Sequence, residues 1–115
     1  MKSEELKLRT KTFAHRCVKL CMTLPSSFLG NHLKGQLIRS STSVASNYRS
    51  ACIAQSKASF ISKLSIALEE ADESFFWLEF IIDEKLLNIK LVEPLLNEAR
   101  ELTAIFISSR KTARK

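Results

Sequence analysis

Apolar residues recur every three or four positions along four long segments of the chain, residues 4–24, 31–54, 56–87 and 91–109. This is the period at which side chains return to one face of an α-helix. Each segment therefore predicts an amphipathic helix with one buried stripe. The stripes are Leu6, Phe13, Cys17, Leu20 and Leu24; then Leu33, Leu37, Val44, Tyr48 and Ala51; then Phe60, Leu64, Ala67, Ala71, Phe75, Leu78 and Ile82; and finally Val92, Leu95, Ala99, Leu102 and Phe106.

Capping residues and prolines indicate where these helices begin and end. Ser3 and Ser56 suit the starts of the first and third helices, because a serine oxygen accepts a hydrogen bond from a free backbone N–H. Pro25 ends the first helix, since the residue before a proline avoids helical torsion angles. Pro94 fits only in the first turn of the fourth helix, where its missing N–H does no harm. The basic tail, residues 110–115, is expected to be frayed.

Four such helices with short connections predict one all-α domain over residues 1–115, an antiparallel up-down-up-down four-helix bundle. A chain of 115 residues can bury a single core without a disulfide or metal staple. Apolar residues make up 45% of the chain, which is too high for a disordered protein. Two glycines and two prolines are too few for the many turns of a β-sandwich or barrel.

The cysteines and the N-terminal segment indicate a reducing compartment. Cys17, Cys21 and Cys52 are odd in number and lie on apolar faces, so we expect free core thiols and no disulfide or metal framework. Charged residues as far as Arg16 argue against a secretory signal. The longest apolar run, residues 75–82, contains a glutamate and is too short to span a bilayer. We therefore expect a cytoplasmic protein.

The net charge of +6 is unevenly distributed along the chain. Residues 1–58 hold ten Lys or Arg against two acids, residues 59–98 hold three against nine, and residues 99–115 hold five against one. Such asymmetry favours an acidic partner such as nucleic acid.

A row of basic residues on the first predicted helix is the best candidate for a contact surface. Lys7, Lys11, His15 and Lys19 are spaced four residues apart, opposite the apolar stripe, and Arg9 and Arg16 flank them. Such a row can follow phosphates, although a lysine row can also serve only solubility. The chain has no zinc-finger, RNP or helix-turn-helix pattern, so any nucleic-acid contact is expected to be made to the backbone or to depend on shape.

Polar residues on the second predicted helix lie beside its apolar stripe and predict a structural network with the third helix. Buried polar groups need partners. If the second and third helices are antiparallel, Arg39 passes near Asp72 and Glu73 of the third helix. We predict a network of Gln36, Arg39, Ser43, Asn47, Asp72 and Glu73. A ligand site that uses Arg39 and Asn47 is the alternative, and Arg39 and Arg49 are further candidates for phosphate contacts.

The third predicted helix is apolar on two sides. Phe76, Trp77 and Phe80 lie away from its core stripe. Either this helix is simply the most central one, or these aromatic residues form an interface between subunits, where such residues are enriched.

Catalytic and metal-binding patterns are absent from the sequence. There is no glycine-rich phosphate loop, no G-x-S-x-G, no H-E-x-x-H and no Glu-x-x-His pair of the kind that binds metals in bundles. The acidic residues Glu69, Glu70, Asp72 and Glu73 are therefore interpreted as a solvated or salt-bridged face. We expect no enzymatic activity, no metal and no cofactor.

The second and third segments resemble the four-helix-bundle family of 23S rRNA intervening-sequence proteins. The resemblance rests on residues 36–49 (QLIRSSTSVASNYR), 56–64 (SKASFISKL), 69–74 (EEADES) and 77–79 (WLE). Many relatives carry Asn-Ile-Ala-Glu-Gly where this chain has Asn47-Tyr48-Arg49-Ser50-Ala51, so the glutamate is lost and a positive charge is gained.

The resemblance implies an antiparallel bundle that assembles into a homopentamer, in a family whose molecular function is largely unassigned. A distant relative is the accessory protein of diversity-generating retroelements, a basic pentameric barrel that binds nucleic acid and a reverse transcriptase. At the level of the fold this supports an oligomeric, non-catalytic protein that binds structured RNA or DNA through basic helix faces. The alternative is a scaffold or accessory subunit for a neighbouring-gene protein, such as a reverse transcriptase, with no direct contact to nucleic acid.

Overall fold

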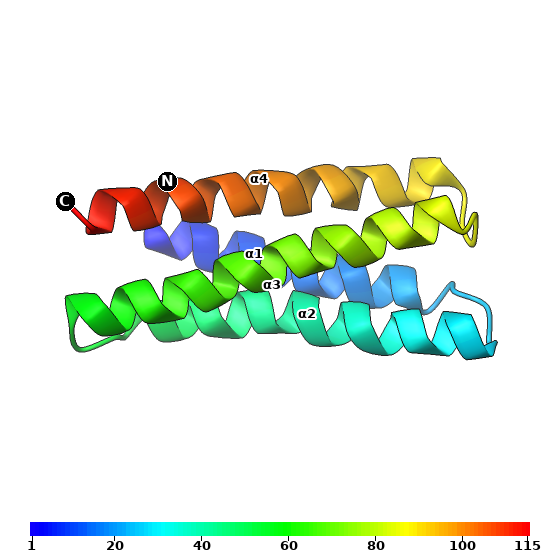
Figure 1. Cartoon of the computed structure of the whole chain (residues 1–115), viewed down its shortest axis with the longest axis horizontal. Helices are drawn as coiled ribbons and strands as arrows, with labels where there is room; N and C mark the ends of the chain where they lie inside the picture. Colours follow the sequence, from blue (N-terminus) through cyan, green and yellow to red (C-terminus); the bar gives the residue numbers. More distant parts are fainter.

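The computed structural model describes residues 1–115 and contains four α-helices and no β-strand (Figure 1). The all-α prediction is therefore confirmed. The helices are α1 (Ser3–Cys21), α2 (Phe28–Cys52), α3 (Lys57–Asp83) and α4 (Ile89–Ala113).

The helices lie side by side around one core in a body that measures 45 × 20 × 19 Å. Each helix packs against its neighbours in sequence, and α1 also packs against α4, so that α1 and α3 lie diagonally across the core, as do α2 and α4. The diagonal pair α2 and α4 meets through side chains, because the Tyr48 ring stacks on the Phe106 ring with centroids 5.7 Å apart. The three connections lie at alternate ends of the body, and the two chain termini lie at the same end (Figure 1). The face formed by α1 and α2 is thus opposite the face formed by α3 and α4.

The predicted apolar stripes form the core. Every stripe residue of the first, second and fourth helices is buried. On α3, Phe60, Phe75 and Ile82 are only half-buried, while Ser74 and Ile81 are fully buried although they were not assigned to the stripe. The buried face of α3 is therefore rotated slightly towards α2.

Buried hydroxyl groups join α2 to α3 inside the core. Ser40 and Ser74 are both 0% exposed, and the Ser74 hydroxyl donates to Ser40 Oγ over 2.9 Å. Ser40 also donates to the Leu37 carbonyl, so each of these polar atoms has a partner. The small serine side chains allow the two helix axes to approach closely at this level.

The α1–α2 connection differs from the prediction by three residues at each helix end. α1 stops at Cys21, and the last N–H groups before Pro25 bond three residues back, from Thr23 to Leu20 and from Leu24 to Cys21. α2 begins at Phe28 because Ser27 accepts a hydrogen bond from the Gly30 N–H over 3.0 Å. The sequence pattern did not predict this cap, because it placed the start of the second helix at residue 31.

The third helix also ends earlier than predicted, because α3 stops at Asp83 rather than at residue 87. Lys85 adopts a left-handed conformation (φ 56°), and the Leu86 N–H bonds to the Ile81 carbonyl over 3.2 Å. This is the hydrogen-bond pattern that usually ends a helix at a glycine. With lysine in that position, the stop was not visible in the sequence.

The limits of α4 correct two further predictions. The helix begins at Ile89, where the Asn88 side chain accepts from the Lys90 N–H, so Pro94 lies in the second turn rather than the first. The tail is helical as far as Ala113 rather than frayed. Arg110 donates to Ser65 Oγ over 3.3 Å and Lys57 donates to the Lys115 carbonyl over 3.0 Å, and these contacts hold the end of α4 against the start of α3.

The three cysteines are free thiols. Cys17 and Cys21 are buried and Cys52 is half-buried. Burial raises the pKa of the Cys17 thiol far above its usual range and that of Cys21 to about 11. None of the four helices carries an apolar stretch that could span a lipid bilayer.

The two glycines of α2 are expected to respond in opposite directions to alanine. A Cβ on Gly30 would lie 2.0 Å from the Pro25 carbonyl oxygen, whereas a Cβ on Gly35 would meet nothing within 4 Å. Gly30→Ala should lower the free energy of unfolding by more than about 1 kcal/mol, because the α1–α2 turn must move. Gly35→Ala should raise it by about 0.5–1 kcal/mol through helix propensity. Urea denaturation followed by circular dichroism measures both, and equal effects of the two substitutions would contradict the close approach at Gly30.

Candidate functional site

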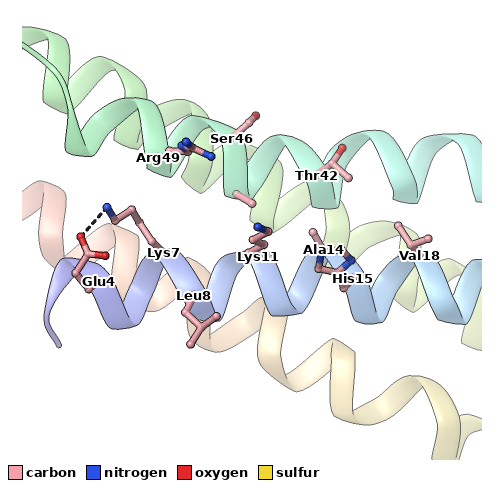
Figure 2. A pocket seen from close by; sticks show the side chains of 11 residues that line it. Glu4, Lys7, Leu8, Lys11, Ala14, His15, Val18, Thr42, Ser46 and Arg49 are labelled. Atoms are coloured by element: carbon pink, nitrogen blue, oxygen red, sulfur yellow. Dashed lines mark ion pairs between the residues drawn. The ribbon is translucent and has the colours of Figure 1, made fainter.

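A groove runs along the outer side of the contact between α1 and α2 (Figure 2). We call it the α1/α2 groove, and its volume is about 580 Å³. Its lining residues are Glu4, Lys7, Leu8, Lys11, Ala14, His15 and Val18 from α1, and Thr42, Ala45, Ser46 and Arg49 from α2.

The groove is hollow because α2 presents only short side chains to it over two turns. Thr42, Ala45 and Ser46 lie opposite Ala14 and Val18. The two hydroxyls are used within the helix, since Thr42 donates to the Ile38 carbonyl and Ser46 to the Ser43 carbonyl. The floor is thus small, largely apolar and without a free donor.

Positive charges surround this floor. Lys7, Lys11 and Arg49 extend into the space between the two helices, and His15 lies further along α1 (Figure 2). Lys7 forms an ion pair with Glu4 over 2.7 Å. Lys11 and Arg49 have no carboxylate within 4.0 Å, so their charges are available to an anionic ligand.

The structure brings together only part of the predicted phosphate-binding set. Lys7, Lys11 and Arg49 line the α1/α2 groove, whereas Arg16 and Lys19 are exposed outside it. Arg16 lies two helical turns from Arg9, on the side of α1 that faces α4. Arg16 therefore lies on a different face of the bundle from Lys7 and Lys11.

Arg39 is placed by the structure in an ion-pair network with α3. Its guanidinium donates to Glu70 over 2.8 Å and to Glu73, and the Trp77 indole also donates to Glu73 over 3.1 Å. The predicted network is thus present in part, but its second acid is Glu70 and not Asp72. Residues 70 and 73 are one turn apart on one face of α3, whereas Asp72 is turned towards α4 and lines a different groove.

The remaining members of the predicted polar network interact locally or not at all. The Asn47 amide donates to both the carbonyl and the hydroxyl oxygen of Ser43, each over 2.9 Å. Gln36 makes no side-chain hydrogen bond and does not join the network. Asn47 is therefore occupied by its own helix rather than directed at a ligand.

Phe76, Trp77 and Phe80 form an aromatic cluster on the outer side of α3. Their ring centroids are 4.9 to 6.4 Å apart, and the His32 ring of α2 meets Trp77 edge-on at 5.7 Å. Phe76 is 49% exposed, while Trp77 and Phe80 are half-buried. The cluster thus leaves apolar surface in contact with solvent.

The sequence did not reveal the ion pair that joins α1 to α4. Arg9 donates to both oxygens of Glu98, each over 2.7 Å, and contacts Glu101 over 3.2 Å. The hydrogen bond with Glu98 raises the pKa of Arg9 above its usual value, and burial opposes this shift. The pair lies 89 residues apart in the chain, so only the fold brings it together.

Arg39 and Arg49 should therefore differ in their effect on stability. Arg39→Gln leaves Glu70, which is 14% exposed, without its partner and should lower the free energy of unfolding by about 1 kcal/mol. Arg49→Gln breaks no ion pair and should stay within about 0.5 kcal/mol of the wild type. Urea denaturation of both variants tests this assignment, and a larger loss for Arg49→Gln would reverse it.

Comparison with known proteins identifies the family of the chain and solved structures that it resembles. The family model of the 23S rRNA-intervening sequence protein matches residues 4–108. A crystal structure of a protein with unknown function from the S23 ribosomal protein family of Bacteroides thetaiotaomicron VPI-5482 is 37% identical in sequence, with a TM-score of 0.84. The alignment covers 96% of this chain and 99% of that one. No curated protein matches the chain.

Proposed function

We propose that this chain, which belongs to the family of 23S rRNA-intervening sequence proteins, binds the phosphate backbone of structured RNA or DNA in its α1/α2 groove. The observation that carries the proposal is the convergence of Lys7, Lys11 and Arg49, from two helices, on one hollow surface. The family match confirms the resemblance seen in the second and third segments and leaves the activity open.

The form of the groove favours backbone contacts over base recognition. Lys11 and Arg49 are cations without acidic partners, and neutralising phosphates with such side chains releases counterions. The small floor residues Ala14 and Ala45 let a backbone approach the helices. The groove contains no Phe, Tyr or Trp side chain on which a base could stack.

A non-catalytic role fits the same surface. The hydroxyls of Thr42 and Ser46 donate to backbone carbonyls, so neither is paired with a base that would activate it. His15 lines the groove without a carboxylate that would orient it. Binding, not group transfer, is the chemistry these residues support.

We also propose that the helices form an antiparallel up-down-up-down bundle that assembles into a cytoplasmic homo-oligomer. The order of contacts supports the antiparallel arrangement, because partner numbers fall along one helix as they rise along the next. On α2 and α3 these pairs are His32 with Trp77 and Arg39 with Glu73, and on α3 and α4 they are Lys57 with Lys115, Ser65 with Arg110 and Phe75 with Arg100. The partly exposed Phe76 cluster is the proposed subunit interface, and the family resemblance suggests five copies.

Charge reversal in the α1/α2 groove should weaken binding to nucleic acid. The double variant Lys11→Glu, Arg49→Glu is expected to bind a labelled duplex at least about tenfold more weakly at 0.1 M salt. The slope of log affinity against log salt should decrease by about 1 for each side chain. Fluorescence anisotropy titrated at several salt concentrations measures both quantities.

The control is Lys85→Glu, Lys90→Glu, which makes the same charge change at exposed positions near the α3–α4 connection. If both double variants lose affinity equally, only the net charge matters and the groove is not the site. If the wild type binds neither RNA nor DNA at low salt, the nucleic-acid proposal is wrong.

Phe76→Glu should dissociate the oligomer by placing a charge in the aromatic cluster. Light scattering after size exclusion should give a multiple of 13.0 kDa for the wild type and a mass close to 13.0 kDa for the variant. Leu91→Glu, at a residue that is 58% exposed on α4, is the matched control and should keep the wild-type mass. An unchanged mass for Phe76→Glu would place the interface elsewhere.

A protein-binding scaffold is the second candidate function. Leu8 at the edge of the groove is 67% exposed, and a phosphate backbone offers it no apolar contact. A neighbouring-gene protein, such as a reverse transcriptase, would cover this leucine. Binding that is insensitive to salt would favour this candidate over nucleic acid.

A further inference from the structure

A second basic surface lies on the α3/α4 face, opposite the α1/α2 groove. We call it the α3/α4 basic face, and its residues are Lys57, Arg100, Lys111 and Arg114. Residues 100, 104, 107 and 111 follow one stripe of α4, because they are three or four positions apart. Lys57 lies at the start of α3, where its amine reaches the Lys115 carbonyl over 3.0 Å.

This face is also hollowed. A groove of about 290 Å³ between α3 and α4 is lined by Asp72, Phe75, Arg100, Thr103, Ala104 and Ile107. The Arg100 guanidinium lies 5.3 Å from the centre of the Phe75 ring, which holds it in place without neutralising its charge. Thr103 donates to the Ala99 carbonyl, so its hydroxyl proton is used within the helix. The rest of the lining is the small Ala104, the apolar Phe75 and Ile107, and the opposite charges of Arg100 and Asp72.

The charge of this face is not compensated towards the end of the bundle. Residues 110–115 contain four Lys or Arg and no acid. None of the four residues of the α3/α4 basic face has a side-chain carboxylate within 4.0 Å. Because α4 is helical to Ala113, these cations are held at defined positions over about 20 Å rather than on a loose tail.

The two basic surfaces cannot contact the same short duplex. They face away from each other across a body about 20 Å thick. DNA of a few helical turns is stiff, with a persistence length of about 150 base pairs. A duplex of about 12 base pairs, roughly 40 Å long, therefore occupies one surface only.

We propose that each chain binds two segments of nucleic acid, one in the α1/α2 groove and one on the α3/α4 basic face, and so bridges them. This inference rests on the proposed function and adds to it a second site and a bridging role. The partner at the second site is again a phosphate backbone, because the face offers separated point charges, and the aromatic ring in its groove, Phe75, is half-buried with the Arg100 guanidinium over it rather than open to a base.

Capture of one duplex by another tests the bridge. A duplex of about 12 base pairs is immobilised, protein is added, and a second, fluorescent duplex is supplied in solution. The wild type should retain the fluorescent duplex. The triple variant Arg100→Glu, Lys111→Glu, Arg114→Glu should still bind the immobilised duplex through its groove but should capture at least about tenfold less of the second one. Lys57 and Arg110 are left unchanged because they bond to the Lys115 carbonyl and to Ser65.

Two controls keep the outcome interpretable. Lys85→Glu, Lys90→Glu should capture like the wild type, and circular dichroism verifies helicity in each variant. If the triple Glu variant is unfolded, the corresponding triple Gln variant is tested in its place. It should capture severalfold less of the second duplex than the wild type does.

Undiminished capture by the triple variant would overturn the inference, because an oligomer with one site per chain would then suffice. A wild type that binds the first duplex but captures no second one would also overturn it while leaving the proposed function intact. A wild type that binds no duplex or structured RNA at all would remove both.

Discussion

Small side chains on α2 determine how closely α1 and α3 can pack on either side of it. Ser40 and Ser41 are both fully buried, and consecutive residues of a helix point about 100° apart. Ser40 meets Ser74 of α3, while Ser41 lies against Cys17 of α1 and favours ionisation of that thiol, although burial dominates its pKa. A larger residue at either position would push a neighbouring helix outward and open the core.

The same constraint produces the surface hollow. On the outer side of the buried serines, α2 presents Thr42, Ala45 and Ser46 to the groove. Ala14 and Val18 of α1 lie opposite them. The helix axes are kept near each other by the buried serines, but the short outer side chains do not fill the space above the contact. The small side chains of α2 therefore have two consequences: they allow the interior to pack closely, and they leave a groove between the long cationic side chains at the surface.

The interior of the fold could be predicted from the sequence better than its ends or its surface. Periodicity identified every core residue of α4, because burial there follows a regular stripe. The end of α3 could not be predicted, since Lys85 adopts the conformation that glycine normally supplies. The sequence predicted the row of basic residues on the first helix but not the groove that this row lines together with α2. Arg39 and Arg49 are ten residues apart on α2, which turns one towards α3 and the other towards α1, and their different roles become visible only when both neighbours are in place.

The distribution of ion pairs separates the charges that hold the bundle from those that do not. Of the 18 Lys and Arg residues, only Lys7, Arg9 and Arg39 lie within 4.0 Å of a side-chain carboxylate, and the latter two join helices. The other fifteen add repulsion within a body only 20 Å across, and such repulsion opposes compact folding. Apart from Lys57 and Arg110, whose hydrogen bonds hold the end of α4 against α3, their removal would therefore cost the fold little. A polyanion in the α1/α2 groove or on the α3/α4 basic face would relieve the repulsion. Since the helices need so few of these charges for their own packing, the stability of the bundle does not account for the sites at which the cations gather, and these cations meet the requirement of the proposed contact with a phosphate backbone.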